Sequence, residues 1–340
     1  MAFLKRVPGT IVNGPSASTR EVRFEEAAYK NLFQVAPHPP QESAALRPSL
    51  AVERESFHEL DVALAEEDRA LWCYMNPRER PSFTLQLLDD LGRMQAMIAR
   101  LFAAEHHTGE RPFDYFVLGS RLPGVFSLGG DLTLFRRSIE QRDAAGLLHY
   151  ARACVEGGYA NYTGYSQRVV TIALIQGDAL GGGFEAALSC DLIVAERQCT
   201  FGLPEILFNL FPGMGAYSFL SRRIGAVKAE QMILSGRMYS AEEMHSMGIV
   251  DVLAETGQGK RAVRDYIAAN RSRHNAHSAV YQVRRRVNPV TLEELHNVAE
   301  LWVDAALRLS DQDLRRMSRL VAAQDRARQR RMAECMAAAD

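Results

Sequence analysis

The sequence predicts an α/β fold in which strands and helices alternate, followed by a helical C-terminal region. Residues 169–177, VVTIALIQG, are apolar almost throughout, which is typical of a strand buried on both faces of a parallel sheet. Strand-like and helix-like segments alternate around this run, and that pattern favours layers joined by right-handed crossovers. From Lys228 onward the apolar residues recur mostly at helical spacing.

The first 50 residues differ from the rest of the chain. They contain six prolines and little periodicity, which indicates an extension with one short helix around residues 21–33. We therefore expect three parts: an N-terminal extension at residues 1–50, a core at 51–255 and a helical region at 256–340.

The core is expected to begin with a strand pair and a helix. Residues 57–75 fit two strands around a polar turn at 66–68. After a break bounded by prolines, Ser82 is expected to cap the next element, since a hydroxyl can accept a bond from a free helix amide. Residues 83–102 have apolar side chains at helical spacing, and 113–118, FDYFVL, fit a short buried strand.

Further elements follow the same alternation. A short strand at 125–127 enters a glycine turn, and a long helical region at about 132–167 is expected to break near Gly157 and Gly158. LIVAE at 192–196 and IVDVL at 249–253 fit strands.

Composition narrows the classes of protein. Lys and Arg total 40 against 41 for Asp and Glu, a net charge of -1, which gives no reason to expect nucleic acid or a membrane surface as a partner. The five cysteines form no CxxC pair, so neither a disulfide framework nor a metal site is expected, and no cofactor is indicated. Without a signal-peptide pattern or a run of about 18 apolar residues, we expect a soluble cytoplasmic protein.

The segment with the clearest chemistry contains three glycines, Gly181 to Gly183, which follow the apolar strand after the residues DAL at 178–180. Glycines let the backbone turn tightly and approach a ligand closely. They also begin a helix whose first N–H groups have no partner and could stabilise a developing oxyanion. The same glycines would also suit a tight strand-to-helix turn that binds nothing.

Two acidic residues lie in otherwise apolar surroundings nearby. Glu185 lies in the first turn of the small, apolar helix that follows the glycines, and Glu205 lies in the loop segment GLPEI. A buried acid is costly unless it is paired or used, and two such acids can act as acid and base. Simple dipole complementation by Glu185 and an ordinary turn role for Glu205 remain the alternatives.

A second glycine turn, SLGGD, follows the strand at 125–127. This turn could supply another oxyanion donor, and Asp131 is expected to be the N-cap of the following helix.

Taken together and in order, FSLGGDL, GDALGGGFEAALSCDLIVAE and FGLPEI resemble the crotonase, or enoyl-CoA hydratase/isomerase, superfamily. GLPEILFNLFPGMGAYSF, MYSAEEMHSMGIVD and the C-terminal AELWVDAALRLSDQDLRRMSRLVAAQ are most similar to the bacterial diffusible-signal-factor synthases. These enzymes make cis-2-unsaturated fatty acids for quorum sensing. The resemblance covers about residues 57–324.

The resemblance implies a fold built as a spiral of ββα turns. It also implies assembly into trimers or dimers of trimers, which are common in this superfamily. It implies that the amides of Gly130 and Gly182 form the oxyanion hole and that Glu185 and Glu205 are catalytic. It also implies dehydration of a 3-hydroxyacyl group on acyl carrier protein, followed by thioester hydrolysis. A sensor kinase is a further implied partner.

The chain departs from typical hydratases at two places. Residues 212–217, PGMGAY, replace a proline-glycine-alanine-glycine-glycine-threonine run, and 81–84, PSFT, replace an asparagine-alanine-leucine segment. Both changes favour a carrier-protein substrate over a CoA ester. A CoA-dependent enoyl-CoA hydratase and a partner-binding protein without turnover remain alternatives.

An acyl tunnel is expected just after the second glutamate. Its candidate lining consists of Leu207, Phe208, Phe211 and Met214, with Leu210 and Phe219 beside them. The same side chains would also suit an ordinary hydrophobic core.

Overall fold

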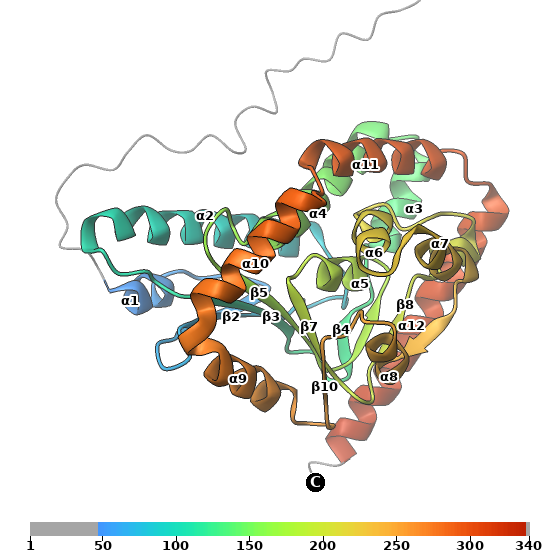
Figure 1. Cartoon of the computed structure of the whole chain (residues 1–340). Helices are drawn as coiled ribbons and strands as arrows, with labels where there is room; N and C mark the ends of the chain where they lie inside the picture. The colour runs from blue at the N-terminus through green and yellow to red at the C-terminus, as the bar shows by residue number, and fades with distance from the viewer. Residues whose placement is uncertain (1–46, 338–340) are drawn as a thin grey trace, which may run out of the picture. The chain divides into compact units, whose positions relative to one another are not determined.

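The computed structural model describes residues 47–337, beginning just before helix α1 (Pro48–Glu53) (Figure 1). Side chains at 105–108, at 325 and from 327 onward are not described. The helix expected around residues 21–33 therefore lies outside the described residues.

The larger sheet has six strands in the order β1-β2-β3-β5-β7-β10. They are β1 (Leu60–Ala65), β2 (Ala70–Met75), β3 (Tyr115–Ser120), β5 (Val170–Ile175), β7 (Leu192–Glu196) and β10 (Val252–Ala254). Only the β1–β2 pair is antiparallel among these. Every residue of β5 is buried, which confirms the prediction of a strand covered on both faces.

The smaller sheet has four strands in the order β4-β6-β8-β9. They are β4 (Val125–Ser127), β6 (Asp178–Leu180), β8 (Thr200–Gly202) and β9 (Met238–Ser240). Strands β4, β6 and β8 each follow a strand of the larger sheet after a short connection, and each leads into a helical segment. The chain therefore makes repeated ββα turns between two sheets.

The helices that follow these turns position the site. They are α2 (Leu85–Thr108), α3 (Leu132–Glu140), α4 (Ala144–Thr163), α5 (Gly182–Leu188) and the 3-10 helix η1 (Pro204–Phe208). Asp131 caps α3 as predicted, since its carboxylate accepts bonds from the N–H groups of Thr133 and Leu134.

Two expectations about these helices were wrong. Thr84, and not Ser82, caps α2, because its Oγ1 accepts a 3.0 Å bond from the N–H of Leu87 while the chain at Ser82 is still in a turn. The break in the long helical region falls between α3 and α4, where Asp143 caps α4. Gly157 and Gly158 lie inside the continuous helix α4.

From Ala216 onward the described chain is mostly helical, with strands β9 and β10 between the helices, and the elements after residue 256 are helices, as predicted. The α-helices of this part are α6 (Ala216–Ile224), α7 (Ala226–Ser235), α8 (Ala241–Ser246), α9 (Gly259–Asn270), α10 (His274–Val287), α11 (Leu292–Ala306) and α12 (Asp311–Ala337). Helix α11 packs on α4, and α12 packs on α3 and η1 (Figure 1). Arg284 and Arg285 tie α10 to the core through the buried carboxylate of Asp191.

Trp302 on α11 is a buried core residue, and it packs edge-on against Phe135 of α3. Strand β10 begins at Val252, three residues later than the strand expected at 249–253. Ile249 and Val250 still belong to the turn after α8, because their N–H groups donate hydrogen bonds to the carbonyl of Met244. Across residues 47–337, none of the helices combines the length and the apolar character needed to cross a membrane.

Candidate active site

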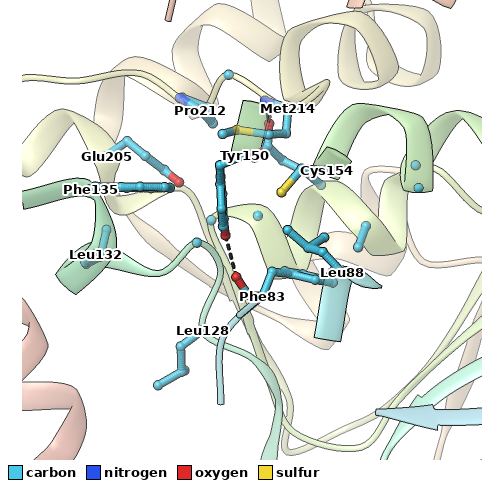
Figure 2. Close-up of a pocket in the computed structure, with 18 of the residues that line it drawn as sticks. Phe83, Leu88, Leu128, Leu132, Phe135, Tyr150, Cys154, Glu205, Pro212 and Met214 are labelled. Carbon is cyan, nitrogen blue, oxygen red and sulfur yellow. Dashed lines mark hydrogen bonds between the residues drawn. The ribbon is translucent and has the colours of Figure 1, made fainter. Parts of the chain in front are cut away.

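A cavity opens among α2, α3, α4, α5, η1 and the C-terminal helices α11 and α12 (Figure 2). It encloses about 1000 Å³ of empty space, including the part that is open to solvent. Gly130, Gly182, Glu185 and Glu205 all line it. The structure therefore brings the four predicted site residues together in one place, although they come from three separate turns of the chain.

The two glycine turns lie against each other in the wall of the cavity. A Cβ atom placed on Gly129 would lie 2.8 Å from the amide nitrogen of Gly182, and one on Gly182 would lie 3.4 Å from the amide nitrogen of Gly130. Gly129 also has a φ of +94°, which disfavours any side chain. The backbones can approach this closely only because both turns are built from glycine.

The N–H groups of Gly130 and Gly182 remain available to a ligand. Within residues 47–337, neither N–H donates a hydrogen bond to another part of the chain. Two amides on adjacent backbones, both at the cavity wall, suit an acceptor atom that gains negative charge.

Glu185 lies in the first turn of α5 and is buried, with 3% of its surface exposed. Its Oε1 accepts bonds from the N–H groups of Met214 and Ala216, at 2.8 and 3.0 Å. Burial raises the pKa of this carboxyl to about 7, although the two amides favour its charged form. The PGMGAY segment, where the sequence departs from typical hydratases, supplies both amides.

Glu205 is the second residue of η1, directly after Pro204. Its Oε2 is buried and has no hydrogen-bond partner among the described residues. Burial, and then the nearby charge of Glu185, raise the pKa of Glu205 to about 8. Because Glu185 accepts two amide bonds and Glu205 Oε2 accepts none, we assign the proton that the pair retains near neutral pH to Glu205.

The predicted acyl-lining residues divide into two groups. Phe208 and Met214 line the cavity, as does Leu210. Leu207, Phe211 and Phe219 are not among the described residues that line the cavity. Leu207 is 55% exposed, because it lies on the outer side of η1. Phe219 is buried in the core, and Phe211 is partly buried against it.

Another part of the lining was missed by the sequence analysis. Helix α2 contributes Leu88, Leu91 and Met94, and helix α4 contributes Gly157 and Gly158. The helical spacing of the α2 residues is visible in the sequence, and a glycine pair within a helix signals missing side-chain volume. Neither signal indicates which helices face each other, so the cavity wall could not be derived from them.

Tyr150, Phe135 and Trp302 were also missed as cavity residues. Figure 2 shows the hydroxyl of Tyr150 directed at the carbonyl of Phe83. Among the residues that the structure describes, no group of three or more His, Cys, Asp or Glu side chains is placed to hold a metal ion.

Two sheets linked by ββα turns, with glycine-rich connections that meet at one cavity, define a crotonase-type protein. Residues 86–320 match the family model for enoyl-CoA hydratase/isomerase. The chain belongs to this family.

Curated relatives agree with this assignment. The chain is 36% identical over 135 residues to a probable enoyl-CoA hydratase of Rhizobium meliloti, covering 38% of this chain and 51% of that protein. It is 34% identical over 149 residues to the mitochondrial methylglutaconyl-CoA hydratase of Rattus norvegicus, covering 44% of this chain and 45% of that protein. The matched region spans about half the length of these relatives.

Solved structures confirm the predicted fold. An enoyl-CoA hydratase from Bacillus halodurans overlaps with a TM-score of 0.65 at 21% identity, covering 77% of this chain and 99% of that chain. Pseudomonas aeruginosa DspI overlaps with a TM-score of 0.52 at 25% identity, covering 69% and 92% of the respective chains.

Proposed function

We propose that the protein adds water to, or removes it from, the C2–C3 bond of a fatty-acyl thioester. The observation that carries this proposal is the meeting of two raised-pKa carboxyls, Glu185 and Glu205, with two unengaged amides in one cavity. Acid and base chemistry near pH 7 requires carboxyls whose pKa values lie near the working pH.

In the hydration direction, the thioester oxygen accepts bonds from the N–H groups of Gly130 and Gly182. The carboxylate of Glu185 takes a proton from water, whose oxygen forms a bond to C3. The C2–C3 electron pair moves toward the thioester carbonyl, and the negative charge on its oxygen is stabilised by the two amides. Glu205 then gives its proton to C2. Losing one such donor typically costs about 3 kcal/mol of transition-state stabilisation.

In the dehydration direction, Glu205 takes the C2 proton and Glu185 gives a proton to the departing 3-hydroxyl group. This direction needs the proton of the resting pair on Glu185 rather than on Glu205. The protonation favoured in the ligand-free site therefore suits hydration more directly.

The main proposal and its finer form differ in the group that carries the acyl chain, which is either CoA or acyl carrier protein. The relatives named above are CoA hydratases, which favours a CoA thioester. The finer proposal is that the chain dehydrates a 3-hydroxyacyl-acyl carrier protein and then hydrolyses the thioester, releasing a cis-2-unsaturated signal acid. It is supported by the PGMGAY segment, which differs from typical hydratases and whose backbone binds Glu185.

The test compares both carriers with one purified protein. Trans-2-dodecenoyl-CoA, 3-hydroxydodecanoyl-CoA and 3-hydroxydodecanoyl-acyl carrier protein are supplied separately, and products are identified by mass spectrometry and NMR. Interconversion on CoA, lost in Glu185→Gln and Glu205→Gln but kept in the surface control Glu140→Gln, supports hydration chemistry. Free cis-2-dodecenoic acid from the carrier-protein substrate supports the signal-synthase form.

Two outcomes would contradict these proposals. A trans product that stays on its carrier would exclude the signal-synthase form while leaving the hydratase. No turnover of any of the three substrates, together with retained binding of a sensor kinase, would favour a partner-binding role without catalysis. Trimer formation stays a prediction, which light scattering of the purified protein tests.

A further inference from the structure

Tyr150 on α4 makes two backbone contacts beside the first glycine turn. Its side chain is fully buried. The hydroxyl donates a 2.6 Å bond to the carbonyl of Phe83 (Figure 2). It also accepts a 3.1 Å bond from the N–H of Asp131. It therefore joins helix α4 to two segments that are far apart in the sequence.

Both segments hold the peptide group that presents the Gly130 N–H. The N–H of Phe83 donates a 2.8 Å bond to the carbonyl of Gly129, and this carbonyl belongs to the same peptide group as the N–H of Gly130. The N–H of Asp131 belongs to the next peptide group along the chain. Tyr150 thus fixes the neighbours of the Gly130 N–H on both sides.

The contacts affect the strength of this donor as well as its direction. A hydrogen bond to the carbonyl of a peptide group polarises that group and strengthens its N–H as a donor. The bond from Phe83 has this effect on Gly130, and it depends on where Phe83 is held. Tyr150 holds Phe83 by its carbonyl.

The second donor is supported differently. The carbonyl of Gly181, which shares a peptide group with the N–H of Gly182, accepts a 3.0 Å bond from the N–H of Glu185. That bond is part of the first turn of α5 and needs no side chain. Of the two amides, only Gly130 is held in place by a side-chain hydroxyl.

We infer that Tyr150 is a positioning residue that orients the Gly130 N–H toward the thioester oxygen. The inference rests on the proposed function, since it assumes that this N–H binds the carbonyl of a thioester. The one proton of the hydroxyl is already donated to the carbonyl of Phe83, so Tyr150 acts through Gly130 and does not exchange a proton with the substrate.

Close packing limits other ways of holding the turn. A Cβ atom on Gly130 would lie 2.5 Å from the ring of Phe135, and that ring packs edge-on against Tyr150 at 5.0 Å between centroids. The turn therefore has no side chain of its own at Gly130, and its orientation depends on the contacts from Phe83 and Tyr150.

The test uses Tyr150→Phe and a chromophoric thioester, 4-(dimethylamino)cinnamoyl-CoA. An oxyanion hole polarises the carbonyl of this probe and shifts its absorption to longer wavelength. For Tyr150→Phe we expect unchanged Kd for the probe, a smaller red shift and a kcat for enoyl-CoA hydration about 10- to 100-fold lower, with KM little changed. The pH profile should keep its shape, because both glutamates remain.

Tyr162→Phe is the matched control. Tyr162 lies on the same helix, is also buried, and accepts a 3.0 Å bond from the N–H of Val290. Tyr162 is not among the described residues that line the cavity. This variant should keep the full red shift and the wild-type kcat. Equal losses in the two variants would mean that only the packing of α4 matters, and would overturn the inference.

A second substitution keeps the test decisive if Tyr150→Phe does not fold. Site-specific 4-aminophenylalanine at position 150 fills the same space and retains a donor for Phe83, but accepts a bond poorly. It should give a red shift and kcat between those of wild type and Tyr150→Phe. A red shift and kcat equal to wild type in whichever variant folds would overturn the inference.

Failure of the proposed function gives a different result. If wild type shifts the probe spectrum but hydrates no enoyl thioester, the reaction is wrong, and the loss of the shift in Tyr150→Phe still supports the role of Tyr150. If wild type binds the probe without a red shift, the Gly130 donor and the inference both fail.

Discussion

Oε1 of Glu205 lies 2.5 Å from the position that a Cβ atom on Gly181 would occupy. The glutamate thus fills the space that a side chain at Gly181 would need. Gly181 also has a φ of +51°, which L side chains rarely adopt. The glycine is therefore required both by backbone conformation and by the position of a candidate catalytic carboxyl.

We expect Gly181→Ala to displace Glu205 and to lower kcat/KM on the order of 100-fold, since small misplacements of a catalytic group are costly. Backbone strain should reduce stability by about 1–3 kcal/mol. Enzyme kinetics and urea unfolding measure the two effects. Gly92→Ala in α2, where a Cβ meets nothing within 4 Å, is the control and should retain activity. Wild-type kinetics in Gly181→Ala would contradict the assignment of Glu205.

The pH dependence of hydration should report the glutamate pair. Activity requires ionised Glu185, with a pKa of about 7, and protonated Glu205, with a pKa of about 8. We therefore expect kcat/KM to rise toward pH 7 and to fall above pH 8, giving a narrow bell. Initial rates between pH 5 and 10 test this. A profile that is flat across pH 6 to 9 would exclude the pair as the acid and base.

The free energy of unfolding should depend on pH through the carboxyl of Glu205. The pKa of Glu205 is raised from an ordinary 4.5 to about 8, so folding favours its protonated form. Its contribution is fully present below about pH 4.5 and is lost as the pH rises through about 8. Glu205→Gln stays neutral at every pH, so it should be more stable than wild type at pH 9, on the order of 2 kcal/mol, and similar at pH 5. Urea unfolding at both pH values measures the difference, and equal differences at the two would contradict the raised pKa.

The space between α2 and α4 should set the acyl chain length. A Cβ on Gly157 would meet only the Gln95 amide, at 3.8 Å, so Gly157→Ala should be tolerated. Gly157→Leu should fill part of the cavity and lower kcat/KM for a dodecenoyl thioester at least about tenfold, since each excluded methylene loses about 0.8 kcal/mol. Crotonyl thioester should be turned over as before. Equal effects on both chain lengths would mean that the acyl chain lies elsewhere.

Local patterns in the sequence predicted much of the fold. The apolar run at β5 and the cap at Asp131 were read correctly because each depends on neighbouring residues. The four candidate site residues also meet in one cavity. Their catalytic roles stay predictions.

What the sequence did not reveal depends on contacts between distant segments. The bond from Tyr150 to Phe83 joins residues 67 positions apart, and no local pattern marks it. Gly157 and Gly158 suggested a helix break, because glycine is unfavourable within helices. In the structure Gly157 instead leaves space against Gln95 of α2, and Gly158 faces Ser189 at the end of α5. Both contacts depend on how α4 packs on other elements.

The cavity is completed by Trp302 of α11 and Leu320 of α12. Gln324 of α12 also lines it, and the rest of its wall comes from residues up to Met214, which precede α11 by many elements. A state in which α11 and α12 had detached would keep both sheets and both glutamates but would lose this side of the cavity. Catalytic rate would then respond to such partial opening at lower denaturant concentrations than circular dichroism, which averages over all the helices. The proposed activity would therefore be a sensitive probe of how firmly α11 and α12 are docked.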